Sequence, residues 1–537
     1  MKKLFFNGRV YMGENEFAEA FAVENGRFTI VGSSREVTAA AAPGDELIDL
    51  GGRFVCAGFN DSHMHLLNFG QTLSTAPLYD HTGSLAEVIA CMKEHLEKHP
   101  PKDGAWLCGR GWNQDYFSDV RRMPTRRDLD LVSAEIPIVI TRACGHCCAV
   151  NSKALETAGI GPDTVSPAGG EIGREDGVPD GRFFDNAMDL ILAAVPVPSA
   201  DEIKDMLALA CAELNRYGIT SSQTDDYCVF GEVPPQVIND AYRELEAEGR
   251  LTVRVYEQCN FTKLEALERF IEDGCVTGRG SDRFRIGPLK LLGDGALGSR
   301  TAHLSKPYAD DPNNRGFSLF APAHLEKMVA YANSKGMQIA VHAIGDACLD
   351  EVLDAIEKAL AFCPRADHRH GVVHCQISRR DQLERIARLG LHVYAQSVFL
   401  DYDNHIVEKL VDPDIAKTSY SWKTLMKEEV SVSNGSDCPV ELPDVMKGVE
   451  CAVTRRSLDG TGPYLPGEAY TVGEALDSFT IRGAEASFEE REKGRIAPGF
   501  IADFTVLGAD PFVTAPEKLH TIPVLRTYSG GDCVFEK

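Results

Sequence analysis

The stretch Phe54-Val-Cys-Ala-Gly-Phe-Asn-Asp-Ser-His63-Met-His65 is an apolar, β-prone run that ends abruptly in two histidines. Side chains of an extended chain alternate between two faces, so His63 and His65 are expected to point the same way. Two imidazoles on one face at the end of a strand can hold one metal ion. A lone His-x-His is more often a pair of ordinary surface or core histidines. Whether His63 and His65 bind metal therefore depends on which residues the rest of the chain supplies.

A regular alternation of helix-like and β-like segments begins at residue 201 and continues to residue 437. Strict alternation predicts a parallel sheet, and the seven strands of this stretch together with the opening strand predict a closed (β/α)8 TIM barrel. The fold class is therefore α/β. The expected barrel strands lie at 54–60, 218–224, 251–256, 286–292, 337–342, 371–374, 391–398 and 430–437.

The segments outside this alternation predict two additions to the barrel domain, which is expected to span 54–487. Both chain ends, 1–53 and 488–537, are β-rich and punctuated by turn signals such as Asn7-Gly8. Because chain termini are often close, we expect them to form one small β-sandwich domain. The stretch of about 70–200, with an amphipathic helix at 84–99, is expected to be an α/β insertion after the first barrel strand.

Composition excludes several classes of partner. The 537 residues carry a net charge of −25, which argues against nucleic acid and anionic membrane surfaces. No apolar run has the length of a signal peptide core or a membrane span, so a cytoplasmic location is expected. The sixteen cysteines then indicate reduced thiols. Cys144-Gly-His-Cys-Cys148 could be a zinc or redox motif, but buried apolar thiols are the favoured interpretation because no second cysteine pair accompanies it.

The carboxyl ends of the expected barrel strands carry residues that could bind metal. Catalytic groups of a parallel barrel gather at this face, and so many histidines at these ends are improbable by chance. The sequence therefore predicts a metal site. Its residues are His63 and His65 on strand one, Lys290 on strand four, His342 on strand five, His374 on strand six and Asp437 on strand eight.

This pattern resembles the amidohydrolase superfamily of metal-dependent hydrolases, and more closely its N-substituted formamide deformylase-like (YtcJ-like) branch. The resemblance covers nearly the whole chain. Ala57-Gly-Phe-Asn60 departs from the usual Pro-Gly-Phe-Ile, but it precedes the ligands. The branch is recognised in Lys290-Leu-Leu-Gly-Asp-Gly-Ala-Leu-Gly-Ser-Arg-Thr-Ala302, Val341-His-Ala-Ile-Gly-Asp346, Gly435-Ser-Asp-Cys-Pro439 and Gly494 to Asp503.

The resemblance implies a divalent metal, with zinc expected, as one or two ions. His63, His65 and Asp437 would hold the first ion, and His342 and His374 the second. Lys290 would be carboxylated to N6-carboxylysine, whose carbamate oxygens can bridge two cations. Carboxylation needs an unprotonated amine, which burial and nearby positive charge promote. A plain salt-bridging lysine is the alternative.

The expected function is hydrolysis of a carbon–nitrogen bond in a small amide, N-formyl compound or cyclic amide. A metal-activated hydroxide would attack, with Asp437 as general base and then acid. Ester or lactone hydrolysis, deamination and isomerisation are alternatives on the same metal site. A non-catalytic scaffold is a remote alternative, since it need not keep all six ligand positions. A small-molecule substrate is the expected partner, and a homodimer is compatible with the sequence.

Further residues are weaker candidates. His146, within the Cys144–Cys148 motif, could contact the substrate or the oxyanion, or could be a hydrogen-bonded loop histidine. The motif residues Asp294, Arg300 and Asp346 could support the ligands or be purely structural. In the insertion, Trp112 and Tyr116 could line the pocket, but core or surface packing is at least as favoured.

Overall fold

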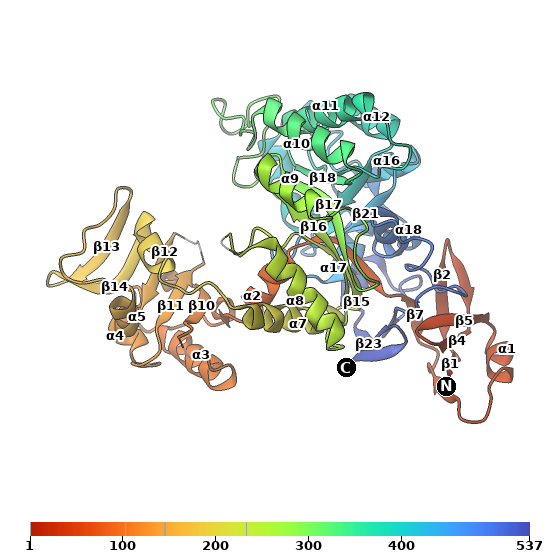
Figure 1. Cartoon of the computed structure of the whole chain (residues 1–537), viewed down its shortest axis with the longest axis horizontal. Coiled ribbons are helices and arrows are strands. Elements are labelled where there is room, and N and C mark those ends of the chain that lie inside the picture. Colours follow the sequence, from red (N-terminus) through yellow and green to blue (C-terminus); the bar gives the residue numbers. More distant parts are fainter. Residues whose placement is uncertain (1, 103, 144–145, 232) are drawn as a thin grey trace. The chain divides into compact units, whose positions relative to one another are not determined.

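The chain forms two compact units in the computed structural model (Figure 1). The structure describes residues 2–102, 104–143, 146–231 and 233–537. One unit comprises Met1–Asn68 with Leu207–Lys537, and the other comprises Phe69–Met206. The larger unit contains the barrel and the sheets made from the chain ends, whereas the smaller unit corresponds to the insertion expected after the first barrel strand.

The larger unit contains an eight-stranded parallel sheet that curls into a nearly closed barrel. Its order, β21-β20-β19-β18-β17-β16-β15-β8, places each strand beside the next one along the chain. This confirms the α/β barrel predicted from the alternation. The strands are β8 (Phe59–Met64), β15 (Ile219–Thr224), β16 (Arg254–Asn260), β17 (Phe284–Leu292), β18 (Ile339–Ala343), β19 (Gly371–His374), β20 (His392–Ala395) and β21 (Val432–Asn434).

Helices separate consecutive barrel strands, and their ends follow local sequence signals. Pro235 and Pro322 occupy the first helical position of α8 and α10, where a missing N–H costs nothing. Gly390 ends α12 in the left-handed region at φ 63°. The main helices are α7 (Ala200–Arg216), α8 (Pro235–Ala247), α9 (Leu264–Glu272), α10 (Pro322–Ser334), α11 (Asp346–Phe362), α12 (Arg380–Leu389), α16 (Trp422–Lys427), α17 (Val445–Thr454), α18 (Val472–Ser478) and α19 (Ile481–Ala486).

Two mixed sheets built from both chain ends share one hydrophobic core. Phe5 and Phe21 of the first sheet meet Phe504 of the second, with ring centroids 5.1 and 4.9 Å apart. Aromatic pairs at such distances stabilise a core beyond the area they bury. The first sheet contains β5 (Arg27–Gly32), β4 (Ala20–Glu24), β1 (Lys3–Phe6) and β6 (Glu46–Asp49); the second contains β24 (Asp532–Glu536), β23 (Val524–Ser529), β22 (Phe504–Leu507), β7 (Phe54–Ala57), β2 (Arg9–Gly13) and β3 (Glu16–Ala18).

The strand predicted at 54–60 is in fact two strands in different sheets. β7 pairs with β22 in the terminal sheet, and the barrel begins only with β8. Gly58 lies between them, and a Cβ at this position would come within 2.2 Å of the Thr220 hydroxyl oxygen. The glycine thus permits the close approach at which the chain passes between the sheets. Every residue from 54 to 60 is buried, so no hydrophobic alternation marked the break.

The smaller unit is built on a six-stranded mixed sheet with its own cores. The helix expected at 84–99 is α3 (Leu85–Lys98), which buries Leu85, Val88 and Met92. Among the described residues, no helix combines the length and the apolar character that a membrane crossing requires. The strands are β13 (Gly170–Glu175), β14 (Val178–Asp185), β12 (Cys147–Val150), β11 (Ile138–Arg142), β10 (Leu107–Trp112) and β9 (Ala76–Pro77).

Candidate metal centre

The structure places the predicted ligand residues at the carboxyl ends of their barrel strands. His63 lies on β8, Lys290 on β17 and His342 on β18, while His374 is the last residue of β19. Asp437 lies just beyond β21. His63, Lys290, His374 and Asp437 are at least nine-tenths buried, whereas His65 and His342 are partly exposed. Burial of so many ionisable groups is costly unless they serve a common partner.

The first and last strands bring three of these side chains into direct contact. Asp437 Oδ1 lies 3.4 Å from His63 Nε2 and 3.1 Å from His65 Nε2. The backbone N–H of Asp437 donates to the His63 carbonyl over 2.8 Å, which fixes the loop. Asp437 also adopts φ 58°, a conformation unusual for a non-glycine residue and common at functional sites.

Two buried glutamines determine the tautomers of His63 and His374. The Nδ1 atom of His63 lies 2.7 Å from Gln258 Oε1, and that of His374 lies 2.6 Å from Gln396 Oε1. Each glutamine donates its own Nε2 to a backbone carbonyl, which sets the amide orientation. Because an amide oxygen only accepts, both histidines carry the proton on Nδ1. Their Nε2 lone pairs are therefore available to a metal ion.

His65 and His342 are oriented by backbone carbonyls instead. His65 Nδ1 lies 3.1 Å from the Asp225 carbonyl oxygen, and its Nε2 faces Asp437. His342 is reversed, because its Nε2 lies 3.1 Å from the Gly295 carbonyl. Its Nδ1 is thus the nitrogen left for ligation. The His342 and His374 rings lie with their centroids 4.4 Å apart.

The donor set fits a divalent cation. One ligand atom from each of His63, His374 and Asp437 lies within 4.8 Å of the others. Within the described residues, the buried Asp437 Oδ1 has no donor aligned with it in hydrogen-bond geometry. A buried carboxylate oxygen without such a donor is costly, and a bound divalent ion would satisfy it. Imidazole and carboxylate ligands suit zinc and similar ions.

The charges within the cluster act differently on its histidines. Burial, followed by the charges of Lys290 and His342 respectively, holds the pKa values of His63 and His374 well below the usual range. Both rings are therefore neutral. Burial also opposes charge on His65, but the Asp437 carboxylate outweighs it and raises that pKa to about 9. The histidines in turn lower the Asp437 pKa, although burial alone would raise it.

Lys290 contacts a carboxylate that sequence reasoning did not identify. Its fully buried Nζ lies 3.6 Å from Asp225 Oδ2 and 3.5 Å from His63 Nε2. Asp225 directly follows β15, so its place at the carboxyl end of strand two was the available signal. The lysine therefore lies between the Asp225 carboxylate and the imidazole cluster.

Two other carboxylates, Asp294 and Asp61, accept hydrogen bonds that fix the loops around the cluster. Asp294 accepts hydrogen bonds from the backbone N–H groups of His303, Ile344 and Gly345, and its Oδ1 lies 3.3 Å from His342 Nε2. It thus positions His342. Asp61 accepts from Ser436 and from the His63 N–H and so joins strand one to the loop after strand eight.

The remaining motif residues have structural partners. Arg300 forms an exposed ion pair with Asp310. The buried Asp346 binds Arg379 over 2.7 Å and accepts from Ser305. Neither side chain belongs to the ligand cluster; both hold the loops in which they lie.

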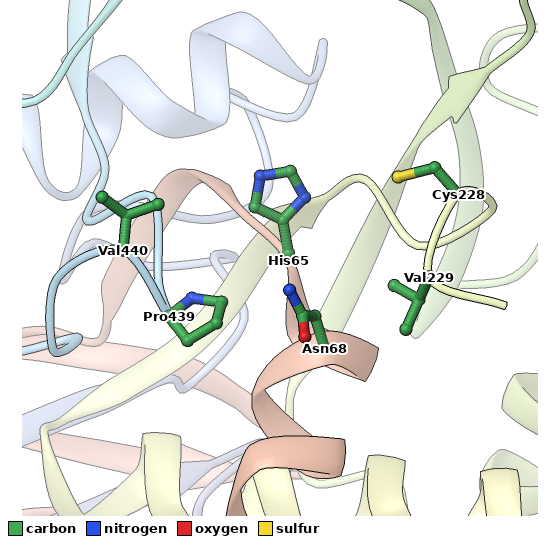
Figure 2. A pocket seen from close by; sticks show the side chains of 6 residues that line it. All are labelled: His65, Asn68, Cys228, Val229, Pro439 and Val440. Atoms are coloured by element: carbon green, nitrogen blue, oxygen red, sulfur yellow. The ribbon is translucent and has the colours of Figure 1, made fainter. Parts of the chain in front are cut away.

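A pocket of about 390 Å³ opens beside His65. Figure 2 shows the His65 ring between Cys228 on one side and Pro439 and Val440 on the other. Asn68 and Val229 complete the lining. The wall is therefore partly apolar, with a histidine of the ligand cluster exposed to it. Its volume falls within the range of small-molecule sites.

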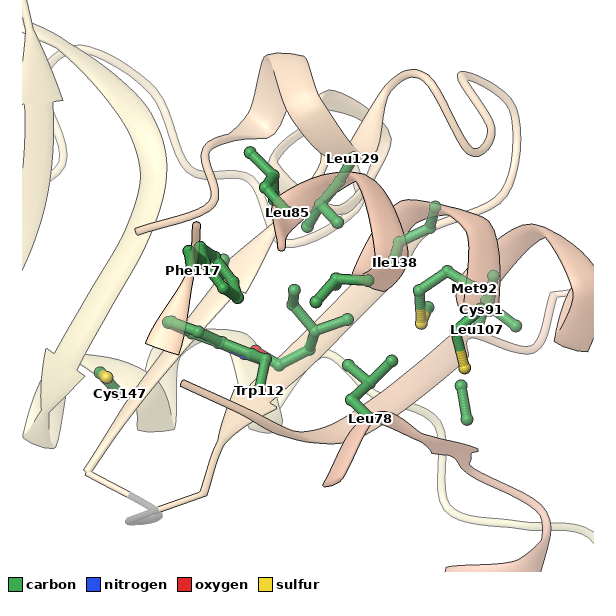
Figure 3. Close-up of a cluster of buried hydrophobic side chains, with 14 residues drawn as sticks. Leu78, Leu85, Cys91, Met92, Leu107, Trp112, Phe117, Leu129, Ile138 and Cys147 are labelled. Carbon is green, nitrogen blue, oxygen red and sulfur yellow. The ribbon is translucent and has the colours of Figure 1, made fainter. Parts of the chain in front are cut away.

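The candidates in the smaller unit have local roles. His146 is exposed, and its Nδ1 lies 3.2 Å from Asp185 Oδ1; its catalytic role stays a prediction. Cys144 and Gly145 of the same motif lie outside the described residues. Trp112 is fully buried beside Phe117 (Figure 3), and Tyr116 is 69% exposed. Packing is thus the role of Trp112.

Comparisons with known proteins agree with this geometry. Residues 46–535 match the model of the amidohydrolase family. The chain is 35% identical to the putative amidohydrolase YtcJ of Bacillus subtilis over the full length of both chains. It is 29% identical to N-substituted formamide deformylase of Arthrobacter pascens, covering 99% of this chain and 97% of that one.

Solved structures show the same architecture. A crystal structure of an uncharacterized metal-dependent hydrolase from Pyrococcus furiosus has a TM-score of 0.78 and 28% identity, covering 95% of this chain and all of that one. Escherichia coli guanine deaminase, at 13% identity and a TM-score of 0.54, shares the fold over the whole of this chain and 99% of its own. The family match, the fold and the histidine–aspartate cluster all point the same way: this chain belongs to the amidohydrolase family of metal-dependent hydrolases.

Proposed function

We propose that this protein hydrolyses a carbon–nitrogen bond of a small amide, with N-formyl compounds as the leading substrate class. The observation that carries the proposal is the convergence of His63, His374 and Asp437 on one point, with each imidazole held in the tautomer that ligates through Nε2. A bound divalent ion, which we propose to be zinc, would polarise the substrate carbonyl and lower the pKa of a water molecule.

Asp437 supplies the proton transfers in this proposal. Its carboxylate accepts a proton from the attacking water and returns it to the nitrogen of the leaving amine. The low pKa imposed by the surrounding histidines keeps it ionised and ready to accept. Water adds across the amide, so the products are a carboxylate and an amine.

The pocket and the relatives support a small substrate with an apolar group. Val229, Pro439 and Val440 line the wall next to His65. Such a wall would receive the N-substituent, while the carbonyl lies toward the ligand cluster. The name of the Arthrobacter relative, N-substituted formamide deformylase, gives the same chemistry for that protein.

We also propose that Lys290 carries a carbamate. Its amine attacks carbon dioxide, a nitrogen–carbon bond forms and one proton is released. The support is that the Lys290 side chain is fully buried, with its Nζ 3.5 Å from Nε2 of the proposed ligand His63, where a carbamate oxygen would reach the ion. Lys290 also lies close enough to Asp225 for an ion pair. An uncarboxylated lysine paired with Asp225 is therefore the competing state.

Metal analysis combined with a substrate screen tests the proposal. Purified protein is assayed for bound metal and for release of amine from N-formyl, N-acyl and cyclic amides. We expect His63→Ala to lose metal and activity together, because it removes a buried ligand. His99→Ala, which alters an exposed histidine of the other unit, serves as the matched control and should keep both. Activity that survives in the metal-stripped protein would sink the proposal.

A further inference from the structure

A second group of ligand-type side chains lies beside the first, at the wall of the pocket. His65, Asp225 and Cys228 each offer one ligand atom within 4.8 Å of the others. His65 follows strand one, whereas Asp225 and Cys228 both lie in the loop after strand two. In Figure 2 the Cys228 sulfur and the His65 ring point toward one another across the pocket.

The Asp225 carboxylate is oriented so that its two oxygens face different neighbours. Oδ2 accepts from Asn260 Nδ2 over 3.1 Å and lies 3.6 Å from Lys290 Nζ. Oδ1 accepts a hydrogen bond from the Cys228 thiol at a sulfur–oxygen distance of 3.6 Å. One oxygen is thus anchored in the barrel, and the other faces the Cys228 thiol.

We propose that His65, Asp225 and Cys228 form a separate position for a thiophilic divalent cation such as zinc or cadmium. Binding breaks the sulfur–hydrogen bond, forms a metal–sulfur bond and releases one proton to solvent. Thiolate, imidazole and carboxylate are the donors that such ions prefer, whereas magnesium and calcium favour oxygen alone. Cys228 is the residue that gives this position its selectivity.

The shared histidine links this position to the hydrolytic one. His65 Nε2 lies 3.1 Å from Asp437 Oδ1 in the first cluster. An ion that recruits His65 toward Cys228 withdraws it from Asp437 and occupies the pocket. Excess zinc or cadmium is therefore expected to inhibit through this position. The binding itself can be measured without substrate, so its outcome is independent of the proposed hydrolysis.

Cadmium provides a direct readout, because a cadmium–thiolate bond produces a charge-transfer absorption in the ultraviolet. Metal-stripped, full-length protein is titrated with cadmium chloride. We expect the wild type to develop this absorption and Cys228→Ser to lose it, since serine cannot supply the sulfur. Cys533→Ser is the matched control, because Cys533 is likewise exposed but lies on β24 in the terminal sheet. It should retain the full absorption.

A second variant distinguishes cadmium binding by all three side chains from binding by the Cys228 thiol alone. Asp225→Asn keeps the shape of the side chain but removes its charge, so cadmium should bind more weakly, with the absorption appearing only at higher concentration. Circular dichroism confirms that each variant is folded. Absorption that persists in Cys228→Ser, is absent from the wild type, or is lost equally in Cys533→Ser would overturn the proposal, as would an unchanged titration of folded Asp225→Asn.

Discussion

His63 Nε2 and Asp437 Oδ1 lie 3.4 Å apart, although the two residues come from the first and the last strands of the barrel. In the sequence, the two residues are separated by all the other strands of the barrel. Closure of the sheet brings them together, and the backbone hydrogen bond from Asp437 N–H to the His63 carbonyl holds that closure. The candidate metal centre therefore depends on the strands at both ends of the barrel sheet.

Replacement of Asp437 by asparagine tests its acid–base role. The variant keeps the volume and loses the negative charge. We expect a folded protein whose kcat/KM falls by about 10²–10⁴-fold, the usual contribution of general acid–base catalysis. Steady-state kinetics on the best substrate, with metal content measured in parallel, provides the check. Normal turnover in this variant would rule out proton transfer by Asp437.

Gln396→Ala tests whether the partner of a histidine sets metal affinity. The variant frees the Nδ1 atom of His374, which now lies 2.6 Å from the glutamine oxygen. Loss of such an orienting partner typically weakens metal binding by about 10–100-fold. Competition with a chromophoric chelator measures the affinity. Unaltered affinity would show that His374 keeps its tautomer without Gln396.

Carboxylation of Lys290 can be observed by ¹³C NMR after incubation with labelled bicarbonate and zinc. We expect a carbamate signal in the wild type and none in Lys290→Ala. Lys98→Ala is the control, since Lys98 is an exposed surface residue and should leave the signal unchanged. A metal-loaded, active wild type that shows no carbamate would favour the ion pair with Asp225.

A buried aspartate predicts how stability changes with pH. Burial raises the pKa of Asp403 to about 6, even though Tyr420 and Gln376 donate hydrogen bonds to it. The folded state therefore holds this proton more tightly than the unfolded state. Protonated Asp403 therefore contributes at most about 3 kcal/mol to the free energy of unfolding. This contribution is complete below about pH 4 and is lost as the pH rises through about 6. Urea unfolding across this window should show a smaller loss in Asp403→Asn than in the wild type.

Packing in the core of the smaller unit predicts that replacing one tryptophan strongly lowers the stability of this unit. Trp112 is fully buried, and its indole N–H donates to the Ile140 carbonyl over 3.2 Å (Figure 3). Trp112→Ala should destabilise this unit by about 3–5 kcal/mol through the cavity it leaves. Tyr116→Ala, at an exposed site, should change stability by less than about 0.5 kcal/mol. Equal effects in urea unfolding would contradict this assignment.

The sequence predicted the barrel and the position of the candidate ligands at its strand ends, because alternation and strand ends are local patterns. His374 ends β19, the strand predicted at 371–374. The sequence did not predict Gln258, Gln396 and Asp225 as partners of the candidate ligands. A polar residue near a strand end does not reveal which atom it will contact. The break at Gly58 also escaped notice, because uniform burial on both sides leaves no periodic signal.

The pairing of β7 with β22 has a consequence for how the chain is made. β7 emerges early in synthesis, but its partner Phe504–Leu507 is translated close to the end. Until then the buried strand Phe54–Ala57 has one open, apolar edge, and such edges invite association with other chains. A message truncated after the barrel would therefore yield an aggregation-prone, protease-sensitive product, even though every predicted metal ligand had already been translated.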